Sequence, residues 1–499
     1  MPEYERATGA PLSGALPGID TTTPAVVLKF DQNVMHHGGL GVIRSLGRLG
    51  VPVYGVHEGP WAPAASSRYL QGRCFWQPSP DDADRVLAGL AALAGRIGQR
   101  AVLIPTDDAG AIFLAEHGDE LRSSFLFPGP PRELPRQLAG KYSLHELCGR
   151  LGVPCAQAAV PGSLDAAREF AAGAGFPLVA KLTTPWRDGS GKLRSTSILA
   201  DEAALDACYR ACDRGGAGLM LQEFIPGGPG QDWFFHGYCD ASAICRPAFT
   251  GVKERSYPAH AGLTSLGRST PNPRLRDQVT GLLARLSYRG ILDLDLRWDA
   301  RDEQYKLLDF NPRLGAQFRL FVDSAGVDVA IAQYLDLTGQ AIPDGEQVSG
   351  RGFLVENYDP IGALGYWRSG ELGPRAWAAS LRTVDETAWF ARDDLRPFGL
   401  MCLRMGLRLA TRPLQRRGAS REDGASREDS ASRPAGAGGG GPRYAAGRAA
   451  GGASRRTAGG ASRRTAGGAS PGGQHRPPTT PELNARQGPQ RTHKEETKV

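Results

Sequence analysis

Near its start, the chain twice places a short apolar run ahead of a polar turn and a helix-like stretch. Residues 25–28 predict a buried strand, and a helix over 40–49 and a second strand over 51–56 follow the turn at Gly38. Residues 101–105 start the same order again. A strand followed by a helix and another strand crosses over with a right hand and builds a parallel sheet. A parallel α/β sheet is therefore expected near the start of the chain.

The glycines of the first turn raise the question of a dinucleotide site. Gly38, Gly39 and Gly41 do not follow the G-x-G-x-x-G spacing, and Glu58 is a weak candidate for a ribose contact. The cluster therefore favours a tight turn, or a substrate contact at the strand ends, over NAD(P) binding. We expect residues 24–125 to form a small Rossmann-like domain.

The basic charge of the chain is confined to its last part. The 499 residues have a formal charge of +7, but residues 412–499 hold 17 Lys+Arg against 7 Asp+Glu, a net +10 that leaves −3 for residues 1–411. This part repeats GASRED from Gly418 and GGASRRTA from Gly451, and it has few apolar residues to offset its ordering entropy. We expect a disordered tail. Because the tail lacks stacking aromatic residues, its charge does not predict nucleic-acid binding.

The start of the chain and its cysteines favour a cytoplasmic location. The first 25 residues lack the basic start and apolar run of a signal peptide, and no apolar stretch is long enough to span a bilayer. The eight cysteines include no C-x-x-C pair, which favours free thiols over disulfides or a zinc site. We therefore expect no membrane partner.

The middle of the chain alternates helix-like and strand-like runs. Ser163 and Asp201 each precede a helix-like stretch and predict N-caps. Strand-like runs at 178–182 and 195–199 lie between the two helices. This mixture indicates α+β structure.

The strongest local signal is a pair of alternating apolar and polar runs between positions 290 and 313, which predicts a β-hairpin. A period of two places Asp293 and Asp295 on one face of the first strand. The same period places Asp309 and Asn311 on one face of the second. Pairing would gather Asp295, Asp309 and Asn311 into an all-oxygen ligand set, which suits Mg²⁺, or Mn²⁺, better than zinc. The alternative is a solvated acidic sheet face.

Lysine is rare before the tail, so its positions are informative. Only six occur there, among them Lys141 at a helix start and Lys181 at a strand end. A compact ammonium group at a strand end suits a phosphate. The loop after Lys181 contains Gly189, Ser190 and Gly191, and its backbone N–H groups can approach phosphate oxygens. The alternative is that these lysines are ordinary surface charges.

An apolar strand from Leu219 ends in a Pro-Gly turn and offers a surface for a purine. Its last residues are Gln222, Glu223, Phe224 and Ile225. Backbone groups there can pair with a purine, and the carboxylate of Glu223 can accept hydrogens from ribose or adenine. Strands followed by turns are common, so this run indicates a nucleotide only together with the lysines.

In their order and spacing, these residues resemble the ATP-grasp superfamily, specifically its carboxylate–amine ligases of the D-aspartate ligase and amino-acid ligase type. The resemblance covers residues 24–345 and implies α/β and α+β architecture, with a Rossmann-like domain ahead of an ATP-grasp fold. The expected boundaries are 1–23 for a disordered leader, 24–125 for the Rossmann-like domain, 126–345 for the ATP-grasp domain, 346–411 for a C-terminal extension and 412–499 for the disordered basic tail.

The resemblance also implies a role for each candidate residue. Phosphate-binding lysines are matched by Lys141 and Lys181, and the closing loop by Gly189, Ser190 and Gly191. The adenine and ribose strand is matched by Gln222, Glu223 and Ile225, with Phe224 between them. Magnesium ligands are matched by Asp295, Asp309 and Asn311. Basic residues that face the γ-phosphate and the acyl phosphate are matched by Lys253 and Arg313.

The implied activity is ADP-forming carbon–nitrogen ligation with ATP and Mg²⁺. An acyl phosphate of a small-molecule carboxylate would pass to an amine, which forms an amide or peptide bond between amino-acid-like substrates. His260 is a candidate proton acceptor in a substrate loop, with an ordinary exposed histidine as the alternative. The remaining alternatives are a phosphoryl transferase or carboxylase on the same scaffold and a silent nucleotide-binding protein. A homodimer is also open.

Two positions depart from the family pattern. The family commonly has Glu where this chain has Asp295 and Asp309, which leaves the number of metal ions open. Asp293 has no match in the family motif, so Asp293→Asn is expected to be milder than the same change at the other two positions.

Overall fold

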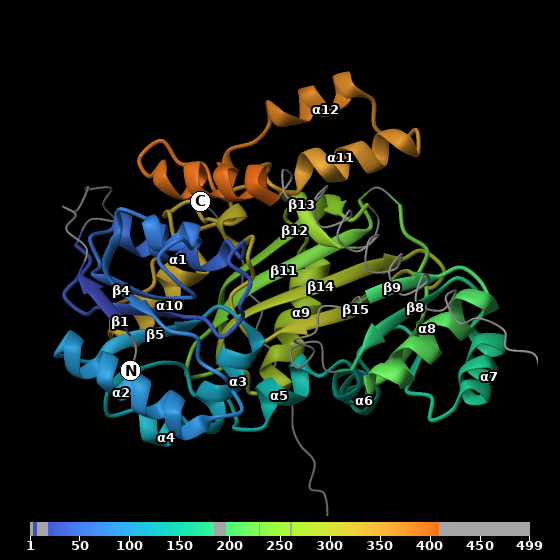
Figure 1. Cartoon of the computed structure of the whole chain (residues 1–499), viewed down its shortest axis with the longest axis horizontal. Helices are drawn as coiled ribbons and strands as arrows, with labels where there is room; N and C mark the ends of the chain where they lie inside the picture. The colour runs from blue at the N-terminus through green and yellow to red at the C-terminus, as the bar shows by residue number, and fades with distance from the viewer. Residues whose placement is uncertain (1–2, 7–17, 184–195, 229, 260–261, 409–499) are drawn as a thin grey trace, which may run out of the picture. The chain divides into compact units, whose positions relative to one another are not determined.

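A computed structural model describes the chain except for residues 1–2, 7–17, 184–195, 229, 260–261 and 409–499. All the described residues lie in one compact unit, Met1–Ser426. Within this unit, the described residues form three β-sheets with helices packed against them (Figure 1). None of the described helices is long and apolar enough to cross a membrane.

The first sheet has six strands in the order β1-β4-β3-β2-β5-β6. Its strands are β1 (Glu3–Arg6), β2 (Ala25–Leu28), β3 (Val53–His57), β4 (Leu70–Phe75), β5 (Ala101–Pro105) and β6 (Phe125–Leu126). Its helices are α1 (Gly38–Arg48), α2 (Ala83–Ile97), α3 (Asp108–Glu116) and α4 (Gly118–Leu121). β2 pairs in parallel with both β3 and β5, so the predicted parallel α/β sheet is confirmed. Within the predicted leader, β1 pairs antiparallel with β4.

A smaller sheet of four strands follows, in the order β7-β10-β8-β9. Its strands are β7 (Ala158–Ala159), β8 (Leu178–Leu182), β9 (Thr196–Leu199) and β10 (Leu219–Glu223). The helices of this part are α5 (Leu134–Ala139), α6 (Lys141–Leu151), α7 (Leu164–Ala174) and α8 (Glu202–Gly215). Both predicted N-caps are confirmed, because Ser163 accepts from the N–H of Ala166 and Asp201 accepts from that of Ala204.

The largest sheet has seven strands in the order β15-β14-β11-β12-β13-β16-β17. Its strands are β11 (Asp232–Cys239), β12 (Cys245–Tyr257), β13 (Leu263–Ser269), β14 (Gly290–Asp299), β15 (Gln304–Asn311), β16 (Gly352–Leu354) and β17 (Glu386–Thr387). The predicted hairpin is confirmed: β14 and β15 pair antiparallel, with Asp295 opposite Asp309 and Asp293 opposite Asn311. Helices α9 (Pro273–Arg285) and α10 (Val329–Leu337) pack on this sheet.

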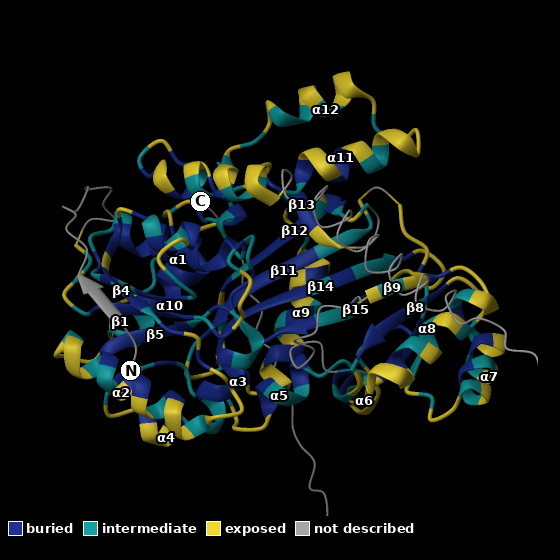
Figure 2. Cartoon of the chain, in the orientation of Figure 1, coloured by how far each residue is buried: buried dark blue, intermediate teal, exposed yellow. Residues whose placement is uncertain are grey.

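The C-terminal helices lie at the rim of the unit. They are α11 (Asp359–Arg368), α12 (Pro374–Leu381) and a last helix over 396–408. Figure 2 shows the strands of the large sheet mostly buried and α11 and α12 largely exposed, and α12 contributes no buried residue. Arg255 of β12 holds α11 through two contacts with the Asp359 carboxylate, at 2.8 and 3.0 Å.

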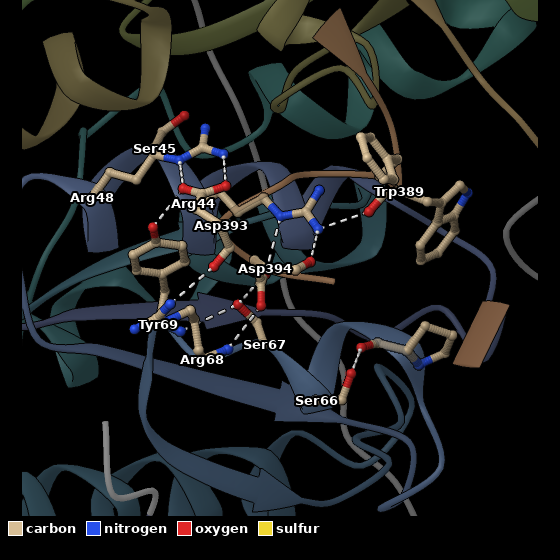
Figure 3. A network of polar contacts seen from close by, with 12 residues as sticks. Arg44, Ser45, Arg48, Ser66, Ser67, Arg68, Tyr69, Trp389, Asp393 and Asp394 are labelled. Atoms are coloured by element: carbon tan, nitrogen blue, oxygen red, sulfur yellow. Dashed lines mark hydrogen bonds and ion pairs between the residues drawn. The ribbon is translucent and has the colours of Figure 1, made fainter. Parts of the chain in front are cut away.

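A buried polar network ties the segment before the last helix to the first sheet (Figure 3). Arg44 of α1 is 1% exposed, and its Nε donates to the Asp394 carboxylate at 3.1 Å. Ser67 Oγ donates to the same carboxylate at 2.7 Å. The neighbouring Asp393 pairs with Arg48 in a more exposed position. The C-terminal segment is thus part of the same packed core as α1.

Candidate active site

The centre of the candidate site is a pair of aspartates on neighbouring strands. Asp295 of β14 lies directly opposite Asp309 of β15, so the pairing of the two strands brings them together as expected. Their side chains are 31% and 27% exposed, so a ligand can reach both. Asn311 follows on the same face of β15, and its amide nitrogen donates to the carbonyl and carboxylate oxygens of Asp293 at 3.2 and 3.3 Å. The structure therefore brings the three predicted oxygen ligands together.

Three of the four predicted basic residues surround this aspartate pair. Lys141, the first residue of α6, contacts the Asp309 carboxylate. Lys253 of β12 reaches Asp295 Oδ1 at 3.3 Å. Lys181 of β8 donates to the backbone oxygen of Leu308 at 2.9 Å. Because Lys181 belongs to the four-stranded sheet and Leu308 to the seven-stranded sheet, the site lies where the two sheets meet.

The charged side chains of the site shift one another's pKa values. Burial lowers the pKa of Lys181 to about 8. Burial raises the pKa of Asp295, and the carboxylates of Asp293 and Asp309 add to the rise while Lys253 opposes it. Burial also acts to raise the pKa of Asp309, but the ammonium groups of Lys141 and Lys181 outweigh it and lower the pKa. The carboxylates repel each other here and are compensated by cations.

The donor set fits magnesium bound together with phosphates. Mg²⁺ takes oxygen ligands and is usually held by one or two carboxylates plus substrate phosphates. Asp295, Asp309 and Asn311 supply such a set. The described residues contain no group of three or more His, Cys, Asp or Glu side chains that could hold a metal ion. The site therefore fits a metal that arrives with a nucleotide better than a metal in an all-protein cage.

Arg313 lies just beyond the aspartate pair, between two further carboxylates. Its Nη1 contacts Asp293 Oδ2 at 3.1 Å, and its Nε contacts Asp108 Oδ1 at 3.2 Å. Burial acts to raise the pKa of Asp293, but the neighbouring His236 and Arg313 outweigh it, so the pKa is lowered. Asp293 is thus part of a buried ion-pair network, and the expectation that Asp293→Asn is the mildest of the three changes stays a prediction.

The strand expected before the Pro-Gly turn is β10 (Leu219–Glu223), and its role in binding a purine stays a prediction. Gln222 is 6% exposed and Ile225 is 2% exposed. The Glu223 carboxylate contacts Arg301 at 3.1 Å and Lys306 at 3.6 Å, so these two cations compete with a ribose for it. Phe224 lies beside the guanidinium of Arg297, with 5.9 Å from Cζ to the ring centroid.

Four candidate residues cannot be placed. Gly189, Ser190, Gly191 and His260 lie outside the described residues. The predicted closing of the glycine loop over the phosphates and the predicted proton transfer by His260 stay predictions.

The sequence did not single out several residues that the structure brings to the site. Arg297 donates to the backbone oxygen of Ile225 at 3.0 Å, and Arg301 holds Glu223. His236 and Asp108 contact the Asp293–Arg313 pair. Only Lys306 carried a usable signal, because it is one of the six lysines before the tail. The others come from strands and turns far apart in the chain, where spacing carries no information.

A parallel sheet is thus followed by two further sheets, and at the junction of these two sheets three lysines lie around a pair of opposed aspartates. The chain also has a relative among proteins of known function. The chain is 24% identical over 243 residues to a D-aspartate ligase of Enterococcus faecium (strain Aus0004), a match that covers 46% of this chain and 56% of that ligase. The chain therefore spans little more than half the length of this relative. No protein-family model matches the chain.

Solved structures similar to the chain include two enzymes of low sequence identity. One is the biotin carboxylase domain dimer of the Hydrogenobacter thermophilus 2-oxoglutarate carboxylase, in complex with MgADP, ADP and bicarbonate. It is 16% identical, with 65% of this chain and 72% of that chain covered and a TM-score of 0.48. The other is an N5-carboxyaminoimidazole synthetase from Staphylococcus aureus, 11% identical, with 64% and 79% covered and a TM-score of 0.48.

Proposed function

We propose that this chain is an ADP-forming carbon–nitrogen ligase, which activates a small-molecule carboxylate with ATP and transfers it to an amine. The observation that carries the proposal is the cluster of Lys141, Lys181 and Lys253 around the opposed carboxylates of Asp295 and Asp309. Such a cluster suits an anionic group that arrives with a divalent cation. The likeness to a D-aspartate ligase supports amino-acid-like substrates.

In the first step, an oxygen of the substrate carboxylate attacks the γ-phosphorus of ATP, and ADP leaves. Catalysis of phosphoryl transfer is mainly positioning and charge stabilisation. Lys141, Lys181 and Lys253 would hold the phosphate oxygens, and each lysine would exchange its present contact for a phosphate. Mg²⁺ bound to Asp295, Asp309 and Asn311 would supply charge neutralisation for the phosphate oxygens.

In the second step, the amine attacks the carbonyl carbon of the acyl phosphate. Inorganic phosphate leaves with the oxygen that came from the carboxylate, and an amide remains. Arg313 would hold the phosphate through its guanidinium group, because an arginine binds such oxygens with directed N–H groups. No side chain becomes covalently attached to the substrate.

The proposal is tested by a screen for ADP formation over pairs of carboxylates and amines, with mass spectrometry of the products. A ligase forms ADP only when both substrates are present, and a product appears whose mass is that of the two substrates less one water. A matched variant, Lys181→Ala, should lose ADP formation and remain folded. ADP formation that needs no amine would contradict the ligase and favour the other transferases of this scaffold.

A further inference from the structure

Asp293 is the hub of a network beneath the proposed phosphate site. It is 4% exposed and contacts three side chains, one from β11 and two from the end of β15 and the loop directly after it. His236 Nε2 lies 3.0 Å from Oδ1, while Arg313 Nη1 lies 3.1 Å and Asn311 Nδ2 lies 3.3 Å from Oδ2. One carboxylate thus links a proposed metal ligand, a proposed phosphate-binding arginine and a histidine that the proposed mechanism does not use.

His236 can influence the site only through Asp293. It is fully buried on β11, directly opposite Asp293 in the strand register. Its ring lies against Phe321, with 4.9 Å between the ring centroids. Its Nε2 lies close to the Asp293 carboxylate without a well-aligned N–H bond, so the contact fixes position more than direction. A ligand cannot reach the imidazole.

Gly315 lets the loop after β15 pack closely against His236 and Asp293. A Cβ atom at this position would lie 2.3 Å from His236 Cε1 and 2.6 Å from Asp293 Cγ, far inside van der Waals contact. The absence of a side chain therefore lets the backbone lie on the His236–Asp293 pair. Because Arg313 lies two residues earlier in the same loop, the position of the pair also sets the position of the arginine.

Two of the three guanidinium nitrogens of Arg313, Nε and Nη1, have contacts with described residues. Nη1 contacts Asp293 and donates to the backbone oxygen of Leu314 at 3.1 Å. Nε contacts Asp108, the first residue of α3 beside the first sheet. Among the described residues, these contacts engage Nε and Nη1, so Nη2 is the nitrogen that remains to meet a ligand oxygen. The arginine therefore joins the Rossmann-like part to the large sheet.

We propose that His236 and Asp108 are positioning residues, which hold Arg313 from two sides so that its guanidinium group meets the departing phosphate. His236 acts through Asp293, and Asp108 acts directly. The inference rests on the proposed function and adds two residues outside the phosphate-contacting set. A displacement of a catalytic group by about 1 Å lowers turnover by on the order of a hundredfold.

The test is a double-mutant cycle on turnover. His236→Leu removes the contact with Asp293, and His236→Gln keeps a nitrogen donor that can replace it. We expect His236→Leu to lower kcat about tenfold or more with the KM for ATP within about twofold, and His236→Gln to recover most of the loss. In an Arg313→Ala background, His236→Leu should change kcat by less than about twofold. An equal fold loss in both backgrounds would overturn the inference.

A matched control separates positioning from a general loss of packing. Tyr238 lies two residues along β11, and its hydroxyl contacts the Asp336 carboxylate at 2.5 Å, away from Arg313. Tyr238→Phe removes a polar contact from the same face of the same strand and should leave kcat unchanged. If His236→Leu does not fold, Asp108→Asn serves instead, because Asp108 is 22% exposed. A kcat unchanged by Asp108→Asn would then overturn the inference.

A binding measurement keeps this test independent of the ligase assignment. With MgADP present, the Kd for inorganic phosphate should rise about tenfold in Arg313→Ala, and nearly as much in His236→Leu and Asp108→Asn. If no substrate pair forms ADP but these shifts occur, the proposed function fails and the positioning inference stands. If ADP forms but His236→Leu and Asp108→Asn bind phosphate like the unchanged protein, the inference fails and the function stands.

Discussion

Asp295 and Asp309 lie directly opposite each other on β14 and β15, and each carboxylate contacts a different lysine. Two like charges so close together repel each other, and a divalent cation would relieve the repulsion. This arrangement supports the proposed metal site over a solvated acidic sheet face.

Asp295→Asn and Asp309→Asn test this role. Each change keeps the shape and removes one negative charge, so turnover should fall by about a hundredfold or more and the Mg²⁺ requirement should move to higher concentration. The free energy of unfolding should change by less than about 1 kcal/mol, because the lost lysine contact is partly exposed and the lost repulsion offsets it. Turnover measured against Mg²⁺ concentration checks both variants.

Asp302→Asn is the matched control for that pair. Asp302 lies in the connection of the same hairpin, 41% exposed, and contacts Lys306 at 3.0 Å. Its Mg²⁺ curve should follow that of the unchanged protein. If all three variants gave that same curve, the metal site would be lost and the acidic-face alternative would be favoured.

Asp293→Asn is expected to lower turnover as well, by less than either change at the metal pair and for a different reason. The change leaves Arg313 with one carboxylate partner and His236 without its contact. Turnover should fall by about tenfold or more while the Mg²⁺ requirement stays nearly constant. A Mg²⁺ curve that shifts as far as that of Asp295→Asn would show that Asp293 is itself a ligand.

The pKa of Lys181 predicts how ATP affinity depends on pH. Burial lowers this pKa to about 8, so Lys181 carries its positive charge below pH 8 and loses it as the pH rises above 8. ATP affinity should be level below pH 8 and fall above it, by up to about tenfold per pH unit. Calorimetric titration from pH 6.5 to 9.5 measures this. Lys181→Arg stays charged and should remove the fall, whereas an equal fall in that variant would assign the titration to another group.

Asp394 should matter more for stability than its neighbour Asp393. Asp394→Ala leaves the buried guanidinium of Arg44 without its carboxylate, and breaking a buried pair costs about 3–5 kcal/mol. Asp393 is 34% exposed, and Asp393→Ala should cost about 1 kcal/mol or less. Urea unfolding of both variants measures the two losses in free energy of unfolding. Equal losses would show that the network of Figure 3 does not set the stability of this region.

The parts of the fold that follow local rules could be predicted from the sequence. The parallel sheet came from the order of apolar runs, and the N-caps at Ser163 and Asp201 came from side-chain chemistry. The shared face of Asp309 and Asn311 on β15 came from the alternation of the sequence, which fixes the face of each side chain. The direct opposition of Asp295 and Asp309 depends on the register, which is irregular between Asp295 and Leu296 and does not follow from alternation alone.

The contacts that surround the pair could not be predicted in this way. His236 and Asp293 are far apart in the chain, and they meet because β11 lies beside β14 in a sheet whose strand order does not follow the chain. Asp108 reaches Arg313 only because the first sheet packs near the end of β15. The pattern of residues along the sequence does not show which distant segments become neighbours in the fold. For that reason, the sequence did not show that Asp293 contacts His236, Asn311 and Arg313.

The central claim is that a carboxylate becomes an acyl phosphate on this site, and isotope transfer tests it most directly. A carboxylate substrate found in the screen is labelled with ¹⁸O at both oxygens and turned over with ATP, Mg²⁺ and the amine. Mass spectrometry of the inorganic phosphate should show one ¹⁸O per phosphate, because the attacking carboxylate oxygen leaves with the phosphorus, while the amide keeps the other. Unlabelled phosphate together with a formed amide would contradict the account.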